Sequence, residues 1–336
     1  MTTPTTFRAG GRPSATPRAV PSSAVPRWYG RETIGWCYAF LLPGLVLTAM
    51  FVFYPMGASW VYSTMDWSGF TQGMTFIGLD NYRELIGDPL FWGAFGRSML
   101  FVLVGVPLRV GLALIVAILL NNVIRGRTST FFRTVFFMPV MASAAIMGVV
   151  LTFVLSPNGG PVNTVLVGSG LLRAPIEFLS DPRIAFWVVL LAHTWKNFGM
   201  TLIYWLAALQ TVPDDLYEAA RVDGANGIRQ LLYITLPVLF PFAMVIVVLT
   251  ANENLHAFAL VQAMTGGGPY YVTQVIEVYI YQTAFAPSAA GGIPRLGYAS
   301  AAGCFFGVAT LLIALAQAWA ARGMSEHRKG VKGAEG

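Results

Sequence analysis

The chain has 336 residues, of which 56% are hydrophobic and only 11% are charged, with a formal net charge of +6. Soluble domains carry roughly 25% charged residues, so this composition excludes an ordinary water-soluble protein and indicates an integral membrane protein. The two cysteines, Cys37 and Cys304, lie far apart in apolar segments, which argues against a disulfide framework and against a cysteine metal site.

Both ends of the chain are polar and basic. Residues 1–34 are rich in Pro, Ser, Thr and Arg, a composition that cannot bury a core and therefore predicts a disordered tail. Its five arginines serve as a topology signal, or they rest on anionic lipid headgroups, which attract basic clusters beside a membrane. Residues 322–336 carry four basic residues and are interpreted as a second polar tail.

Between these tails, six apolar segments are long enough to cross a bilayer, which takes about 20 mostly apolar residues. In chain order they cover residues 35–60, 98–120, 134–155, 184–209, 237–260 and 298–321. The first is too long for a cleavable signal peptide, so we expect it to remain as a membrane helix. The predicted fold class is therefore all-α, with a six-helix transmembrane domain over residues 35–321 and helices two to six as its core bundle.

Lys and Arg are distributed unevenly between the two sides of this predicted domain. The two tails and the loops 121–133 and 210–236 together hold 14 of the 21 basic residues, whereas the loops on the other side hold five. Cytoplasmic segments carry an excess of Lys and Arg, so both termini and the 210–236 loop are expected in the cytoplasm. The remaining two, Arg109 and Lys196, lie inside predicted spans.

The fourth predicted span contains polar side chains that share one helix face. An α-helix advances roughly 100° per residue, so His193, Lys196, Asn197, Met200 and Tyr204 fall within one stripe. The first three lie near the middle of the bilayer. Ionisable groups in a membrane are costly and usually face a cavity or a partner, so this stripe is a candidate substrate pathway. Tyr204 could stack on the flat face of a solute, although an aromatic residue in a span more often serves packing.

The fifth predicted span contains a second polar group. Asn252, Glu253 and His256 share a similar arc of the helix. Glu253 could neutralise Lys196 or Arg109 across the bundle, which is a purely structural interpretation of all three charges. A second interpretation, compatible with the first, is a hydrogen-bonded polar wall that suits a hydroxylated solute. Unpaired cations here would favour an anion, whereas pairing with Glu253 would favour a neutral solute.

The loop between the fourth and fifth spans is polar and carries its own helix signals. Thr211 can cap a first helix that stops at Gly224, because glycine readily adopts the left-handed conformation of a helix end. Glu218 and Asp223 are expected as exposed anions, and Pro237 fits near the start of the next helix. From spacing alone, the loop either docks a partner or lies on the membrane surface as an amphipathic segment.

The spacing within this loop resembles the EAA motif of permease subunits of ATP-driven ABC importers. The matching positions are Glu218, Ala219, Ala220, Gly224, Ile234, Leu236 and Pro237. Other segments resemble the maltose and glycerol-3-phosphate permease family, at residues 76–82, 157–163, 265–269, 279–281 and 297–301. They point to the first permease of a heterodimer, and the likeness runs from about residue 36 to residue 321. The chain departs from the family pattern at Phe258-Ala259, where relatives often carry an acidic residue.

The resemblance implies how the loop works and what the chain assembles with. In similar importers the loop seats in a groove of the ATP-hydrolysing subunit, so the expected ATPase-coupling residues are Glu218, Ala219, Ala220, Asp223, Gly224, Leu236 and Pro237. The implied partners are a second homologous permease, two ATP-binding cassette subunits, an extracytoplasmic solute-binding protein and membrane lipid. The implied location is the bacterial cytoplasmic (inner) membrane. ATP and Mg²⁺ would bind the partner ATPase subunits, and no cofactor or metal is expected on this chain.

Several catalytic signatures are missing from the sequence. It contains no Gly-x-x-x-x-Gly-Lys-Ser/Thr phosphate loop, no HExxH metal motif and no Gly-x-Ser-x-Gly elbow. We therefore expect a transport subunit that is not an enzyme, has no catalytic residues and depends on a separate ATPase. The net positive charge belongs to the tails and cytoplasmic loops, so nucleic-acid binding is not expected.

The preferred interpretation is an importer permease that forms half of the translocation pathway for a sugar, oligosaccharide or polyol. A phosphorylated polyol is the second choice of substrate. The expected pathway residues are His193, Lys196, Asn197, Tyr204, Asn252, Glu253 and His256. The alternatives are an ion-coupled secondary transporter that uses the Lys196/Glu253 region, and a membrane scaffold or receptor with a docking loop.

Overall fold

The computed structural model describes residues 31–70, 73–122, 126–286 and 292–333. The predicted N-terminal tail therefore lies, up to residue 30, outside the described residues. The chain divides into two compact units, Met1–Met56 and Gly57–Gly336. The first holds most of the first predicted span, and the second holds all the others.

The first unit contains α1 (Arg31–Thr48), a single π-helical turn η1 (Ala49–Phe53), and the start of α2 (Tyr54–Tyr62). In η1 the Tyr54 N–H donates to the Ala49 carbonyl oxygen, one residue farther back than in an α-helix. Pro55 follows this wider turn directly, and its ring would clash with the carbonyl four residues earlier in a regular α-helix. The turn therefore lets the helix continue past the proline.

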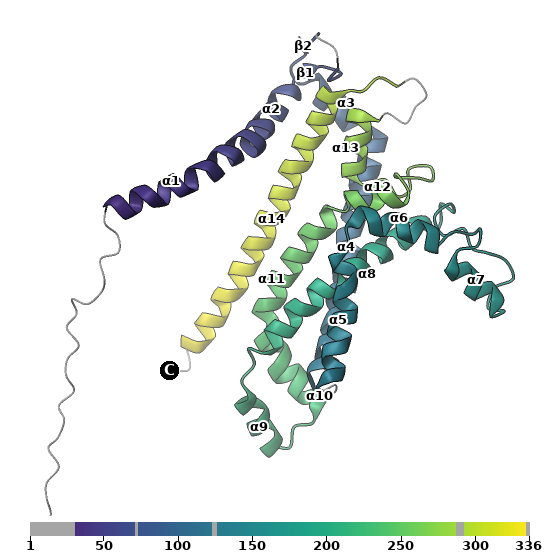
Figure 1. Cartoon of the computed structure of the whole chain (residues 1–336). Helices are drawn as coiled ribbons and strands as arrows, with labels where there is room; N and C mark the ends of the chain where they lie inside the picture. The colour runs from purple at the N-terminus through teal and green to yellow at the C-terminus, as the bar shows by residue number, and fades with distance from the viewer. Residues whose placement is uncertain (1–30, 71–72, 123–125, 287–291, 334–336) are drawn as a thin grey trace, which may run out of the picture. The chain divides into compact units, whose positions relative to one another are not determined.

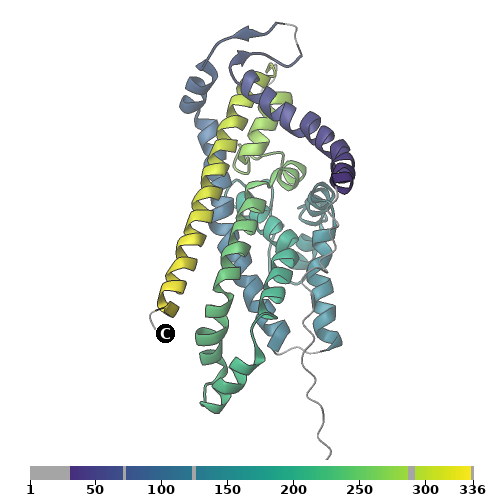
Figure 2. The ribbon, with the colours of Figure 1, turned by 90° about the vertical axis from the view of Figure 1, so that its left-hand side faces the viewer.

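The second unit is built around long helices, several of which run roughly along one direction (Figures 1 and 2). The long helices are α4 (Pro89–Asn122), α8 (Ala185–Leu209), α11 (Leu236–Leu255) and α14 (Leu296–Gly333). α4 packs against both α8 and α11, and α5 (Arg127–Met141) also packs against α8. The polar stripe of α8 is consequently enclosed by other helices, and His193 and Lys196 are buried.

Short elements gather at the two ends of this unit (Figure 1). One end holds β1 (Met65–Asp66), β2 (Thr75–Phe76), α3 (Asp80–Gly87) and α13 (Ile276–Phe285). The other end holds α9 (Asp214–Val222) and α10 (Gly227–Gln230). A side branch holds α6 (Ala144–Val154), α7 (Pro161–Gly168) and α12 (Phe258–Met264). The antiparallel hairpin pairs Met65 with Phe76 and Asp66 with Thr75.

An exposed ion pair joins α3 to the start of α14 at the hairpin end. Arg295 donates to both carboxylate oxygens of Glu84 at 2.6 Å, and its guanidinium lies 4.5 Å from the Tyr298 ring centroid. The hydrogen bond from Arg295 lowers the pKa of Glu84 from its ordinary value. Tyr279 and Tyr298 both donate to Asp88, which ties α13 to the same place.

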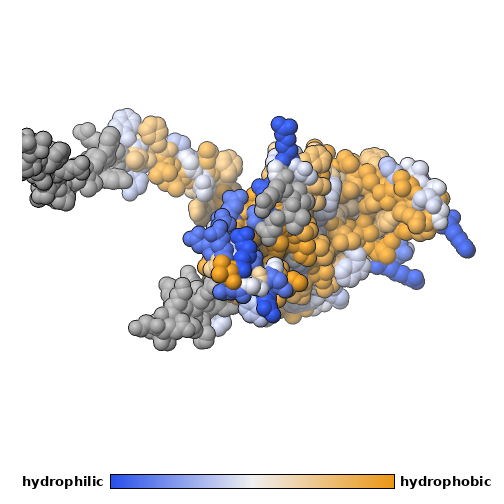
Figure 3. All heavy atoms as spheres, turned by 90° about the horizontal axis from the view of Figure 1, so that it is seen from below, coloured by the Kyte–Doolittle hydropathy of each residue, from blue (hydrophilic) through white to orange (hydrophobic). Residues whose placement is uncertain are grey.

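Apolar side chains fill the interior of the second unit in three clusters, around Trp205, Phe101 and Phe91. The Trp205 indole N–H donates to the Val110 carbonyl oxygen at 3.0 Å, which fixes α8 to α4. Many large apolar side chains nevertheless remain exposed, and Figure 3 shows such residues (orange) over much of the visible surface. An apolar exterior over helices that satisfy their own backbone groups is what a lipid bilayer requires.

Within the described residues, four helical stretches are long and apolar enough to cross a membrane: Gly35–Tyr62, Pro89–Asn121, Gly227–Leu255 and Leu296–Gln317. The bent pair of α5 and α6 makes a fifth if it is counted as one span. α8 matches the predicted fourth span within one residue, but the polar residues of its stripe lower its hydropathy and keep it out of this set. The all-α membrane fold is confirmed, and the count of six spans stays a prediction.

The predicted third span, 134–155, is wrong as a single straight helix. α5 and α6 are bent by 101° across a two-residue break. Pro139 removes a backbone hydrogen bond near the end of α5. Close packing then holds each half separately, because Gly148 of α6 lies against α12 and Gly199 of α8 lies against α5. A Cβ at these two positions would stand 2.6 and 2.3 Å from the nearest atom.

Two other helices differ in extent from their predicted spans. α11 stops at Leu255, five residues before the predicted end of the fifth span, and the chain breaks before α12. The same helix starts early, because α10, the π-helical turn η2 (Leu231–Thr235) and α11 follow one another without interruption. α14 continues past residue 321 to Gly333, through most of the segment interpreted as a polar tail.

Candidate functional site

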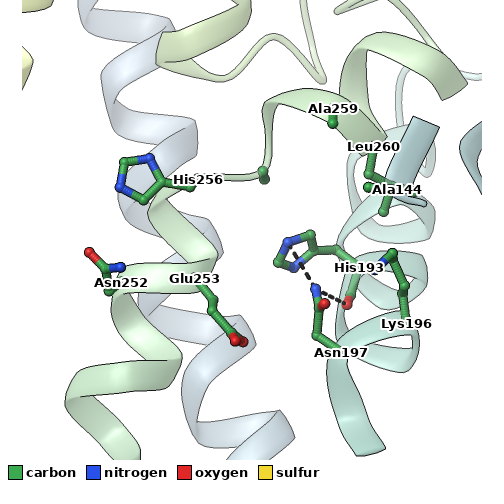
Figure 4. A pocket seen from close by; sticks show the side chains of 10 residues that line it. Ala144, His193, Lys196, Asn197, Asn252, Glu253, His256, Ala259 and Leu260 are labelled. Carbon is green, nitrogen blue, oxygen red and sulfur yellow. Dashed lines mark hydrogen bonds between the residues drawn. The ribbon is translucent and has the colours of Figure 1, made fainter. Parts of the chain in front are cut away.

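Six of the seven predicted pathway residues line one cavity of about 250 Å³ between α8 and α11 (Figure 4). Three belong to α8, namely His193, Lys196 and Asn197. The other three, Asn252, Glu253 and His256, come from the last turn of α11 and from the break that follows it. The remaining lining residues are Ala144, Ala257, Ala259 and Leu260. Two polar segments far apart in sequence are thus brought together.

The seventh predicted residue, Tyr204, is not among the residues that line this cavity. It is half-buried and packs against the apolar cluster around Trp205. Tyr204 lies about two turns beyond Asn197 on α8, so it shares the face of the stripe at a different level of the bundle. Its role in a pathway stays a prediction.

His193 is held by the residue one turn later on α8. The Asn197 side-chain amide contacts His193 Nε2 at 3.2 Å and donates to the His193 carbonyl oxygen at 3.2 Å. An imidazole nitrogen that accepts from an amide carries no proton, so the ring is neutral in this arrangement. Phe101 packs edge-on against the ring, with centroids 5.8 Å apart. The histidine therefore gives the cavity a fixed, uncharged polar wall.

Glu253 forms an ion pair with Arg109 of α4, and the pairing of Glu253 with Lys196 is not formed. Arg109 Nη2 lies 2.6 Å from Glu253 Oε2 and donates to the Thr250 carbonyl oxygen at 3.4 Å. The Arg109 side chain is fully buried, whereas the Glu253 side chain is 37% exposed. A buried charge is costly without a partner, and Glu253 is the only carboxylate among the lining residues. Of the two partners that the sequence left open, the structure selects Arg109.

His256 occupies the break between α11 and α12, outside the helix that the sequence predicts for it. Its backbone has φ −103° and ψ 58°, which ends the helix. Its Nδ1 lies 2.7 Å from one carboxylate oxygen of Glu277 in α13, and the other oxygen accepts the Phe258 N–H at 3.0 Å. One carboxylate thus braces both sides of the break. Glu277 is absent from the predicted set, although a carboxylate in an apolar run is the same signal that marks Glu253.

The predicted coupling loop lies at the α9 and α10 end of the unit (Figure 1). Four of its predicted coupling residues, Glu218, Ala219, Asp223 and Gly224, are exposed, and Ala220 is half-buried. α9 ends just before Gly224, which has φ +75°, and the Ala225 N–H donates to the Ala220 carbonyl oxygen at 2.8 Å. This left-handed helix end is the conformation predicted for Gly224.

Thr211 does not cap α9 as the sequence suggests. Its hydroxyl donates to the Ala208 carbonyl oxygen at 2.7 Å, at the end of α8, and Pro213 takes the N-cap position. α9 is anchored by Tyr217, whose hydroxyl lies 2.8 Å from the Thr235 hydroxyl in η2. The loop is therefore tied to the base of α11 through one face and exposes the other.

A second π-helical turn sits where the loop meets the membrane helix. In η2 the Leu236 N–H donates to the Leu231 carbonyl oxygen, and Pro237 follows at the start of α11, which confirms its predicted place. This repeats the order of η1 and Pro55 in the first unit. Leu236 and Pro237 line a shallow, open surface pocket together with Leu232 and Phe240.

Comparison with known proteins gives a consistent picture. Residues 109–326 match the family described as "Binding-protein-dependent transport system inner membrane component". The lactose transport system permease protein LacF of Rhizobium radiobacter is 31% identical, over 89% of this chain and 97% of that protein. The sn-glycerol-3-phosphate transport system permease protein UgpA of Agrobacterium fabrum (strain C58) is 30% identical, over 74% of this chain and 83% of that protein.

The fold also resembles a solved structure of a bacterial ABC transporter involved in the import of the acidic polysaccharide alginate. The two share 28% sequence identity with a TM-score of 0.72, over 87% of this chain and 96% of the other. The family match over residues 109–326 includes the polar cavity and the loop around Gly224.

Proposed function

Because the chain belongs to the family of binding-protein-dependent transport system inner membrane components, we propose that its cavity and loop form half of an ATP-driven import pathway for a carbohydrate or polyol. The chain is an inner-membrane permease of this family, and ion-coupled secondary transport is not favoured. The relatives carry cargo of both charge types, since lactose is neutral and alginate is acidic. Family membership leaves the charge of the cargo open.

The observation that carries the proposal is the cavity between α8 and α11. Its lining combines amide, imidazole and charged groups, whereas the exterior of the bundle is largely apolar. Such groups supply both donors and acceptors, which a solute with many hydroxyl groups needs when it leaves water. Its volume of about 250 Å³ lies just below the roughly 300–1,000 Å³ of typical ligand pockets, as expected for half of a pathway that a second permease completes.

The loop around Gly224 is proposed as the contact with an ATP-hydrolysing subunit. Glu218, Asp223 and the strongly exposed Val222 and Ile228 lie together on the short helices of one end. Apolar side chains exposed beside charged ones are typical of a surface that a partner covers. Pairing of Glu218 with a basic residue of the ATPase, with Gly224 as the bend, would transmit ATP-driven closure to α11.

The remaining assembly follows from the same proposal. The partners are a second homologous permease, two ATP-binding cassette subunits and an extracytoplasmic solute-binding protein. ATP and Mg²⁺ would bind the cassette subunits, and this chain would hydrolyse no ATP itself. The loop and both termini are assigned to the cytoplasm by the excess of Lys and Arg on that side.

Reconstitution of the complete transporter in proteoliposomes tests this function. We expect uptake of a labelled carbohydrate to require ATP, the cassette subunits and the loaded solute-binding protein. Glu218→Ala should reduce uptake and ATP hydrolysis together, whereas Asp214→Ala, which removes an exposed acid from the same helix, should leave both near wild type. Uptake that persists without cassette subunits would exclude an ATP-driven importer.

A further inference from the structure

The two carboxylates nearest the cavity are already in contact with other residues. Glu253 lies 2.6 Å from Arg109. One oxygen of Glu277 lies 2.7 Å from His256, and the other accepts the Phe258 N–H. His193 accepts from an amide and adds no charge. Neither carboxylate therefore forms an ion pair with Lys196, whose ammonium has no direct counter-charge among the described residues.

Lys196 is both enclosed and unpaired. It is 8% exposed and lines the cavity from α8 (Figure 4). Within the part of the chain that the structure describes, it makes no hydrogen bond and no ion pair. Glu253 acts on it only from a distance, because its carboxylate is already bound to Arg109. A lysine in a membrane bundle is costly and is expected to serve a partner or a ligand.

The surroundings of Lys196 suit a ligand that is charged at one point and polar elsewhere. An ammonium is a compact charge with three donors, which binds a carboxylate or a phosphate without a fixed geometry. Asn197, the next residue, adds an amide to the same wall, and Figure 4 shows its side chain on the cavity side of α8. The apolar residues Ala144 and Leu260 line the cavity as well, and an apolar wall of low dielectric strengthens an electrostatic contact beside it.

We propose that Lys196 is an anion-binding residue of the translocation pathway and that the cargo is an acidic carbohydrate with a carboxylate or similar anionic group. This inference rests on the proposed transport function and adds the charge of the cargo to it. The Arg109–Glu253 pair has a separate role, because its contact occupies the Glu253 carboxylate and leaves the lysine without a counter-ion.

Equilibrium binding to the assembled transporter in nanodiscs, with the solute-binding protein omitted, tests the proposal. The probes are radiolabelled trigalacturonate and its carboxyl-reduced, neutral counterpart. We expect Lys196→Gln to weaken trigalacturonate binding at least tenfold and to leave the affinity for the neutral probe unchanged. Lys196→Arg should restore most of the affinity. Arg83→Gln, which removes an exposed charge from α3, serves as the matched control and should change neither probe.

Three results would overturn the proposal. In the first, Lys196→Gln weakens the binding of both probes equally, or of neither, which shows that the charge of the probe is not recognised. In the second, Lys196→Gln fails to assemble with the second permease, which means that the ammonium serves the subunit interface. In the third, nanodiscs with half phosphatidylglycerol abolish trigalacturonate binding that zwitterionic nanodiscs allow, which assigns the site to a lipid headgroup.

The binding assay is separable from the test of transport. If the complete transporter takes up a neutral trisaccharide with ATP while trigalacturonate binding ignores Lys196, the anion site is refuted and the importer function stands. If no carbohydrate is taken up while trigalacturonate binding depends on Lys196, the importer function and the acidic cargo are refuted, and only anion binding at Lys196 stands.

Discussion

The cavity between α8 and α11 and the loop around Gly224 handle polar residues in opposite ways. At the cavity two ionisable groups have a partner from another segment, since Glu253 pairs with Arg109 and His256 contacts Glu277. In the loop, Glu218 and Asp223 are exposed on short helices. Hydrocarbon penalises an unpaired charge heavily, whereas water does not, so only the cavity must satisfy its charges within the chain.

This difference predicts different consequences of substitution. A change in the cavity should alter the stability of the bundle or the selection of cargo, because the contacts of Glu253 with Arg109 and of His256 with Glu277 join separate segments of the bundle. A change in the loop should alter coupling to the partner and leave the bundle folded, because its motif residues contact little of the chain. Lys196 is the informative exception, since it is buried like His193 but lacks a hydrogen-bond or ion-pair partner among the described residues.

Arg109→Gln should produce the largest loss of stability. Removing one partner of a buried pair typically costs about 3–5 kcal/mol, and we expect the lower end because the Glu253 side chain is 37% exposed. Thermal unfolding of the purified chain in detergent measures the loss, and the double variant Arg109→Gln/Glu253→Gln should recover part of it. An unfolding temperature equal to that of Arg83→Gln would mean that the Arg109 pair does not hold α4 to α11.

The sequence predicts which polar residues line the cavity better than it predicts which of them pair with each other. Helical periodicity brings His193, Lys196 and Asn197 to one face, and the cost of charge in a membrane marks Glu253 as a group that needs a partner. Neither argument can choose between Arg109 and Lys196, because that choice depends on how α4 packs against α11. The break at His256 is invisible for the same reason, since it depends on contacts from Glu277 in a distant segment.

In the loop, the local backbone geometry was predictable from the sequence. Its local geometry follows from residue type, as the left-handed Gly224 and the place of Pro237 demonstrate. The bend between α5 and α6 was not predictable in this way, because Pro139 alone permits a kink of any size. The size and direction of that bend come from the separate packing of Gly148 and Gly199 on different neighbours.

Gly199→Ala should disturb the cavity through packing without changing any charge. A Cβ at this position would stand 2.3 Å from the Phe136 carbonyl oxygen, so α5 and α8 must separate, at a cost of about 1–3 kcal/mol. Gly111→Ala in α4 is the matched control, because nothing lies within 4 Å of its added Cβ. Thermal unfolding in detergent compares the two. Equal unfolding temperatures would show that α5 and α8 are less closely packed than the structure indicates.

Gly224→Ala tests the loop side of the comparison. An alanine in the left-handed conformation costs roughly 1–2 kcal/mol. This strain should destabilise the end of α9 locally and leave the bundle folded. We expect ATP hydrolysis by the assembled transporter to lose its stimulation by loaded solute-binding protein while the unfolding temperature stays near wild type. Gly227→Ala, at the start of α10 with open space around it, is the control. Normal stimulation in Gly224→Ala would argue against a bend that transmits closure.

Glu84→Gln should have the smallest effect, because the Glu84–Arg295 pair is the exposed counterpart of the buried Arg109–Glu253 pair. Both of its side chains are about half exposed, and pairs of this kind contribute about 0.2–1 kcal/mol. Arg295 lowers the pKa of Glu84 in the folded chain below its ordinary value of 4.5, so the pair contributes fully above that pH and its contribution is lost as the pH falls through the folded pKa. Unfolding temperatures of wild type and Glu84→Gln, measured from pH 6 down to pH 3, should therefore differ slightly at the upper end and converge at the lower end. A difference that grows with acidity would mean that Glu84 is stabilised in its protonated form, contrary to the two hydrogen bonds that it accepts from Arg295.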